Sequence, residues 1–134
     1  MSVISAVLTG MTPEMAVAEL RPELIDDEAA RRWVMRYLHP TGLWCPRCSS
    51  DDFSMIVTAT WFDGGRVQCK SCGKWFTNRT GTPFDGCAIS WRDLYALLLF
   101  NGIGFTLGEI ASRLDIHPDT VSRMLKRIQE RANV

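Results

Sequence analysis

The chain has 134 residues, of which 46% are hydrophobic and 22% charged; this composition is typical of one compact domain or two very small ones and argues against a disordered or fibrous chain. The formal net charge is zero, but residues 1–30 are acidic and residues 31–134 carry the basic excess, which weakly favours a nucleic-acid partner for the larger part. The longest apolar stretch is far shorter than the roughly 20 residues of a bilayer crossing, and no basic residue precedes the apolar run Val3–Leu8, so we expect neither a membrane protein nor an exported one.

Residues 1–41 are expected to form a helical segment. Thr12-Pro13-Glu14 is typical of a helix start, and Pro22 would end or interrupt that helix. Asp26 then caps a predicted helix over 27–38. Its predicted inner face is apolar and consists of Ala29, Ala30, Trp33, Val34, Tyr37 and Leu38. Its outer face carries Glu28, Arg32 and Arg36, which is typical of a solvated surface. The acidic start of the segment is a candidate contact for a protein partner.

Two Cys-x-x-Cys pairs, Cys45 with Cys48 and Cys69 with Cys72, are separated by twenty residues. Two thiolates on a tight turn can both reach one ion at about 2.3 Å, and two such turns complete a tetrahedron. We therefore predict one structural Zn²⁺ per chain; four sulfur ligands leave no open position for catalysis. The alternatives, disulfides in an exported protein or a redox pair, lack a signal sequence and a βαβ pattern. Cys87 is expected to be a small buried apolar residue, and His39 is not expected to be a fifth ligand.

Residues 42–84 are predicted to form a small zinc ribbon of two to three antiparallel strands. Phe53–Thr60 is rich in β-branched residues, Asp63-Gly64-Gly65 is a turn signal, and short apolar runs flank the second cysteine pair. So small a sheet depends on the metal for much of its stability. Its aromatic residues would pack a miniature core or, less often, stack on unpaired bases; they are Trp44, Phe53, Trp61, Trp75 and Phe76.

Residues 85–134 are predicted to form a three-helix helix-turn-helix unit, which makes the chain an α+β protein. Ser90 begins a capping pattern for a helix to about Phe100, and Thr106-Leu107-Gly108-Glu109 is a capping box for the next helix. Asp115-Ile116-His117 forms the turn, and Pro118 suits the first position of the last helix. The turn departs from the usual pattern, because Asp115 replaces a glycine and His117 replaces a serine or threonine cap. The alternative is an ordinary helical hairpin with a solvated charged face.

In helix-turn-helix proteins the first turns of the second helix meet base edges. Arg123 and Lys126 lie opposite the apolar stripe of the last helix and are the leading candidates for DNA contact. Thr120 and Ser122 are candidates for phosphate or base edges, and Arg127 flanks them. Lys74 and Arg79, beside the ribbon, would extend the footprint.

The order of these parts resembles a known family. The run from Phe76 to Phe84, Phe-Thr-Asn-Arg-Thr-Gly-Thr-Pro-Phe, follows the second cysteine pair and precedes Trp91 and the helices. Residues 25–134 are similar to the N-terminal zinc-ribbon and helix-turn-helix region of bacterial insertion-sequence transposases of the DDE type. The resemblance implies that ribbon and helices bind the element's terminal DNA, while a separate nuclease domain cuts it. The acids after the zinc site lie on predicted caps, turns and helix faces with no sheet to hold two metals, so we expect no enzyme activity.

These features predict a zinc-stabilised, sequence-specific double-stranded DNA-binding protein, transposase-like or a transcription regulator derived from a transposase. We expect it in the cytoplasm, associated with the bacterial nucleoid or with a phage or mobile element. The alternative is a protein-interaction adaptor whose ribbon docks on a transcription or transposition partner. Near-zero net charge and the acidic first thirty residues favour that alternative.

Overall fold

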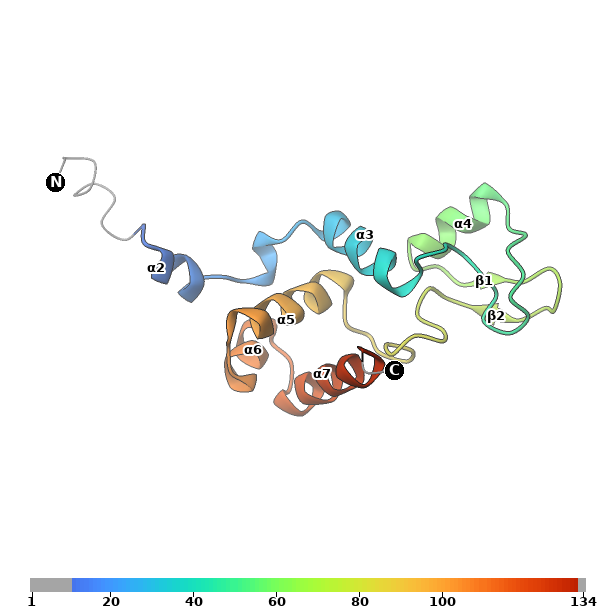
Figure 1. The fold of residues 1–134 in the computed structure, drawn as a ribbon. Coiled ribbons are helices and arrows are strands. Elements are labelled where there is room, and N and C mark those ends of the chain that lie inside the picture. The colour runs from blue at the N-terminus through green and yellow to red at the C-terminus, as the bar shows by residue number, and fades with distance from the viewer. Residues whose placement is uncertain (1–10, 133–134) are drawn as a thin grey trace.

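The computed structural model describes residues 11–132 as an α+β structure with a very small sheet (Figure 1). Residues 1–10 and 133–134, which the predicted terminal segments include, lie outside the described part. The elements in chain order are α2 (Pro13–Ala18), the 3₁₀ helix η1 (Pro22–Leu24), α3 (Asp27–Leu38), α4 (Met55–Phe62), β1 (Val67–Gln68), β2 (Trp75–Phe76), α5 (Trp91–Ile103), α6 (Leu107–Leu114) and α7 (Pro118–Ala132). Among these helices, none has both the length and the apolar character needed to cross a bilayer.

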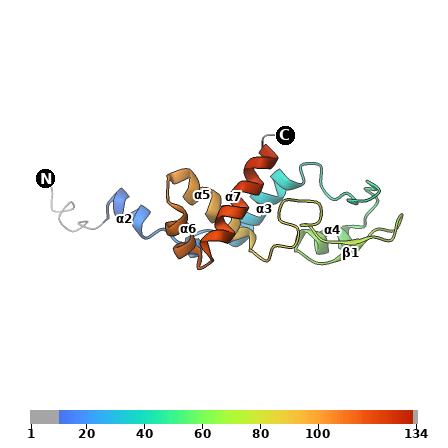
Figure 2. The same cartoon turned by 90° about the horizontal axis from the view of Figure 1, so that it is seen from below.

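The fold has two neighbouring parts. We call residues 42–84, which hold α4 and the sheet, the cysteine unit, and α5, α6 and α7 the helical unit. The views in Figures 1 and 2 agree that the cysteine unit occupies one end of an elongated molecule and α2 the other, with the helical unit between them. The domain boundaries predicted from the sequence stay predictions. Helix α5 contributes side chains to two cores. Its start, at Trp91 and Leu94, packs with the cysteine unit, and its second half, at Leu97 and Phe100, packs with α6 and α7.

Helix α3 forms where the sequence predicts it, and packs against α5. The Asp26 carboxylate accepts a hydrogen bond from the Ala29 amide at 2.8 Å, and Trp33 meets Tyr95 edge-on at 5.0 Å between ring centroids. The predicted inner face is partly wrong: Met35 is buried, whereas Ala29 is exposed and Tyr37 is 67% exposed. Tyr37 lies against the Trp33 ring, at 4.7 Å between centroids, so its contacts are made on the helix surface.

The prediction of a strand within Phe53–Thr60 is wrong, because Met55–Phe62 is helix α4. Ser54 caps it by accepting a hydrogen bond from the Val57 amide at 3.2 Å. The hydroxyls of Thr58 and Thr60 donate to the carbonyls one turn earlier, at 2.8 and 3.0 Å. β-Branched residues favour a strand chiefly when a partner strand offers packing; here the helix instead buries Trp61.

The sheet is one antiparallel pair, in which Val67 pairs with Phe76 and Gln68 with Trp75. Since side chains alternate across a strand, Val67 and Phe76 are buried and Gln68 and Trp75 face outward. The sheet therefore has an inner face against the core and an outer face toward solvent. The prediction of two to three strands is met at its lower limit in the described residues.

Several polar contacts join the cysteine unit to the rest of the chain, among them an ion pair of Arg31 with Asp63 at 3.7 Å and a contact of His39 with Asn78. His39 lies 2.6 Å from the Asn78 carbonyl through Nε2, and the buried Asn78 amide donates to the Phe62 carbonyl at 3.3 Å. Burial lowers the pKa of His39, and the hydrogen bond with Asn78 opposes this shift. The Nε2 atom of His39 is thereby engaged by a backbone carbonyl.

Arg79 makes another connection between the cysteine unit and the helical unit. Its guanidinium lies over the Trp91 ring at 3.9 Å and donates to the carbonyls of Cys87, at 3.2 Å, and of Ile89. The sequence suggested Arg79 as a DNA contact. These contacts hold its guanidinium within the protein, so we leave it out of the interface proposed below.

We expect Arg79→Ala to lower the free energy of unfolding by about 2–4 kcal/mol, because it removes charged hydrogen bonds and a cation–π contact. Denaturant unfolding of the zinc-loaded chain measures this. Arg79→Lys should lose most of the same stability, since an ammonium group cannot stack flat while donating to two carbonyls. Full stability of the lysine variant would contradict this connection and leave only a role for charge.

Candidate metal centre

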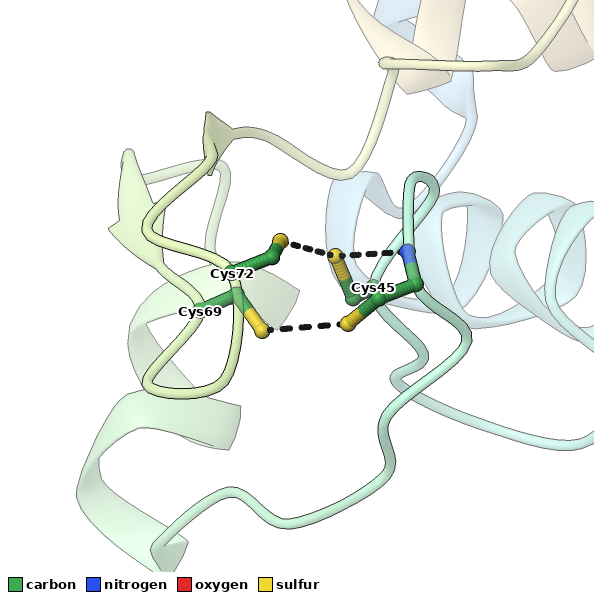
Figure 3. Close-up of side chains that lie close together, drawn as sticks. Cys45, Cys69 and Cys72 are labelled. Atoms are coloured by element: carbon green, nitrogen blue, oxygen red, sulfur yellow. Dashed lines mark hydrogen bonds between the residues drawn. The ribbon is translucent and has the colours of Figure 1, made fainter.

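The four paired cysteines converge on one point from two loops (Figure 3). Their sulfur atoms all lie within 4.8 Å of one another. Two of the contacts join opposite loops: Cys45 to Cys72 at 3.5 Å and Cys48 to Cys69 at 3.6 Å between sulfur atoms. A disulfide would need about 2.05 Å, whereas a tetrahedron with metal–sulfur bonds of about 2.3 Å has edges of about 3.8 Å. The four cysteines are free, and their spacing fits one metal ion.

The two turns that carry the sulfurs have the same backbone pattern. In each, the residue after the second cysteine has a positive φ, 64° at Ser49 and 78° at Gly73. Its amide donates to the carbonyl of the first cysteine, at 3.0 Å for Ser49 and 2.9 Å for Gly73. The amide of the first cysteine donates to the carbonyl five residues later, from Cys45 to Ser50 and from Cys69 to Lys74, at 2.9 Å each. This repeated geometry aims both cysteine pairs inward.

The surroundings of the sulfurs favour ionisation of some thiols and oppose it at one. Burial raises the pKa of Cys45, but the amides of Cys48 and Arg47, at 3.5 and 3.4 Å from its sulfur, outweigh burial; the net pKa falls to about 6. The Cys72 amide likewise lowers the pKa of Cys69. At Cys48 the Ser50 amide favours the thiolate, but burial and the neighbouring sulfurs raise the pKa to about 12.

Four thiolates this close repel one another, so a cation between them is needed for all four to ionise. The donor set is soft, complete and tetrahedral in spacing, which suits a structural ion rather than one that binds substrate. Lys74, predicted to contact DNA, lies directly beside this centre, where its carbonyl closes the second turn. Cys87 is apart from the cluster and half-buried.

The remaining residues predicted to bind DNA lie together on the first two-thirds of α7. Val121 and Met124 are buried beneath them. Ser122, Arg123 and Lys126 are exposed and Thr120 is half-buried; Arg123 donates to the Thr120 hydroxyl at 3.4 Å. Arg127 is also exposed, but it donates to the Pro83 carbonyl at 3.3 Å and to the Cys87 sulfur at 3.2 Å. Arg127 therefore connects α7 to the loop that leads from the cysteine unit, a contact that the sequence did not reveal.

The turn between α6 and α7 is well formed despite its unusual residues. Asp115 takes the left-handed conformation, with φ of 55°, and the Ile116 amide donates to the Ala111 carbonyl at 3.1 Å. His117 accepts a hydrogen bond from the Asp119 amide through Nδ1 at 3.1 Å, the role of a helix cap. The predicted capping box of α6, Thr106 with Glu109, is confirmed.

A further contact that the sequence reading missed lies on the sheet. The Arg66 guanidinium is 5.1 Å from the centroid of the Trp75 ring. Arg66 immediately precedes Val67, which pairs with Phe76, so the strand register places Arg66 diagonally from Trp75. Cross-strand pairing would have given this contact, had the register been known.

No known family model matches the chain, and neither does any solved structure. The chain is 26% identical over 87 residues to an uncharacterized protein in transposable element ISH50 of Halobacterium salinarum. That match covers 64% of this chain but 29% of the relative, so the chain spans less than a third of the relative's length. The finding is a weak similarity to a protein of a transposable element.

We expect the purified chain to carry one Zn²⁺ and to lose the structure of residues 42–84 when a chelator removes it, because the two-residue strands bury too little to fold alone. Metal analysis and thermal unfolding with and without chelator measure this. Cys69→Ser should lose the metal, whereas the matched variant Cys87→Ser should keep it. A metal-free chain that unfolds at an unchanged temperature would contradict the prediction.

The positive φ values at Ser49 and Gly73 predict that adding a side chain at Gly73 lowers the stability of the fold, whereas removing the side chain at Ser49 does not. Gly73→Ala should cost about 1–2 kcal/mol, the penalty of a left-handed L-residue; the added Cβ itself would meet only the Gln68 amide at 4.0 Å. Ser49→Gly should be neutral or raise stability by about 0.5 kcal/mol, since relief of that penalty exceeds the entropy cost of glycine. Chemical unfolding of both zinc-loaded variants gives the values, and a stabilising Gly73→Ala would refute this account.

Proposed function

We propose that this protein is a zinc-stabilised, transposase-like protein that binds duplex DNA sequence-specifically through α7 and has no catalytic activity of its own. It would act as part of a mobile element or as a regulator derived from one. We place it in the cytoplasm, where reducing conditions keep the metal-binding thiols free. The ISH50 relative supports the link to transposable elements.

The observation that carries this proposal is the pairing of α6 and α7 across a short capped turn. Ile110 and Ala111 of α6 and Val121 of α7 are buried together in the core of the helical unit, so the opposite side of α7 is free to enter a groove. Such a second helix of a helix-turn-helix presents its first turns to base edges in the major groove. Ser122, Arg123 and Lys126 occupy that exposed side.

The charges on α7 suit base and phosphate contacts in different degrees. Asp119 is exposed in the first turn of α7 and reduces the local positive charge. Arg123 is exposed, and within residues 11–132 its guanidinium has one hydrogen bond, to the Thr120 hydroxyl, so it can turn to donate two hydrogen bonds to guanine. Lys126 is suited to a phosphate or guanine. Arg127 keeps its tie to the loop at Pro83 and would contribute charge from the edge.

The metal centre would supply order rather than contacts. We assign it to Zn²⁺ because four thiolates in a tetrahedron form a structural zinc site. The ion would fix the two cysteine turns and the sheet, and Lys74 beside it would offer a further cation to a phosphate. The residues of this chain then bind and orient the DNA.

A second candidate function, docking on a protein partner, is favoured by α4. Met55 is 90% exposed and Ile56 is 81% exposed at the start of that helix, and neighbouring exposed apolar side chains are typical of protein contacts. The acidic side chains that precede and begin α3 would suit a basic partner. This function would leave the exposed side of α7 without a role.

We expect the Arg123→Ala, Lys126→Ala double variant to bind a duplex selected from a random pool at least about tenfold more weakly than wild type. The slope of log affinity against log salt should fall by about one to two, because fewer counterions are released. Fluorescence anisotropy across a salt series measures both. The matched control, Arg32→Ala with Arg36→Ala on the exposed side of α3, removes the same charge.

Equal losses in the two double variants would show that α7 contributes only net charge. Absence of salt-sensitive duplex binding by the wild type would favour the docking function, which Met55→Ser with Ile56→Ser should then impair.

A further inference from the structure

The outer face of the two-stranded sheet carries a tryptophan, Trp75, whose side chain lies outside the hydrophobic core. Trp75 is 49% exposed, although its neighbour Phe76 is 3% exposed and Val67 opposite is 5% exposed. Those two side chains already fill the inner face of the sheet. The Trp75 ring is instead paired with the Arg66 guanidinium at 5.1 Å. An exposed aromatic ring paired with an arginine is the arrangement found on stacking surfaces for bases.

The surroundings of Trp75 favour an anionic ligand. Residues 64–84 contain four basic residues and no acidic one: Arg66, Lys70, Lys74 and Arg79. Arg79 is used within the protein. Four thiolates around one Zn²⁺ would also carry a net charge of about −2, so the remaining excess of cations is small. Electrostatic attraction alone would be weak, and the stacking contact would have to supply most of the affinity.

The outer face is also held in place by the metal turn. Gln68, which pairs with Trp75 across the sheet, donates through Nε2 to the Gly73 carbonyl at 3.1 Å. Gly73 closes the turn that carries Cys69 and Cys72. The orientation of Trp75 is therefore linked to the cysteine cluster, as a preorganised binding surface requires.

We propose that Arg66 and Trp75 form a stacking platform for an unpaired base of DNA, so that the protein recognises a duplex with a single-stranded extension. This inference rests on the proposed function, because α7 would hold the duplex. In duplex DNA both faces of each base are covered by its neighbours, so a flat indole can stack only on a base outside the helix. A duplex held by α7 raises the effective concentration of its extension at the sheet.

The test compares a selected blunt duplex with the same duplex carrying a single-stranded extension of about six nucleotides, a length within the range that stacking proteins cover. Binding to the zinc-loaded full chain is measured by anisotropy. The extension should tighten wild-type binding by about 5- to 150-fold, the effect of stacking one base. Trp75→Ala should lose this gain, Trp75→Phe should keep part of it, and Arg66→Gln should reduce it.

Trp44→Ala is the matched control. Trp44 is 47% exposed and, like Trp75, lies close in sequence to a cysteine pair. Its indole, however, donates to the Thr41 carbonyl at 3.3 Å. It should keep the gain, and all variants should bind the blunt duplex as wild type does. Zinc content identifies any variant that fails to fold, and Arg66→Gln then carries the test, because Arg66 is exposed and outside the core.

Each outcome separates the platform from the duplex site. If the wild type binds the blunt duplex and the extension adds nothing, the platform is wrong and the proposed function stands. If a free single strand binds in a Trp75-dependent manner and the duplex does not, the platform stands and the duplex site on α7 is wrong. If Trp44→Ala and Trp75→Ala lose the gain equally, the assignment to Trp75 is overturned.

Discussion

The convergence of four sulfur atoms is the constraint on which the cysteine unit depends. A sheet with two residues in each strand closes too few hydrogen bonds and buries too little surface to fold alone. The two cysteine pairs are separated by twenty residues, and four thiolates at this spacing would repel one another unless a shared cation lay between them. Trp75 lies three residues beyond Cys72, so the outer face of the sheet inherits its position from this centre.

The contacts between the cysteine unit and the helical unit fix the distance between the sheet and α7. Helix α5 contributes to both cores, and Arg79 ties the cysteine unit to Trp91 at the start of α5. Arg127 adds a contact from α7 to the connecting loop at Pro83. Because these contacts lie on both sides of the connection, the sheet and α7 would meet one nucleic acid as a single surface rather than as beads on a flexible linker.

What could be predicted from the sequence was mostly local. The cysteine spacing and the caps at Ser90 and Thr106 involve neighbours within a few residues, and the structure has them as expected. The segment Phe53–Thr60 failed because β-branched residues favour a strand only beside a partner, and the cap at Ser54 decided for a helix. The contacts of Arg79 span up to twelve residues along a loop of irregular path, and no periodicity announces them.

The charge distribution explains why positioned contacts should matter more than overall attraction. The chain has no net charge, and a metal bound by four thiolates would make the cysteine unit less basic than its sequence suggests. Long-range steering toward DNA, the proposed ligand, would therefore be weak. A protein in this situation gains little from non-specific phosphate binding, whose strength follows the number of neutralised phosphates. If the proposed function holds, discrimination would come instead from a few groups in fixed places, the guanidinium of Arg123 on α7 and the indole of Trp75 on the sheet, and the contacts between the two units would keep these groups at a set distance.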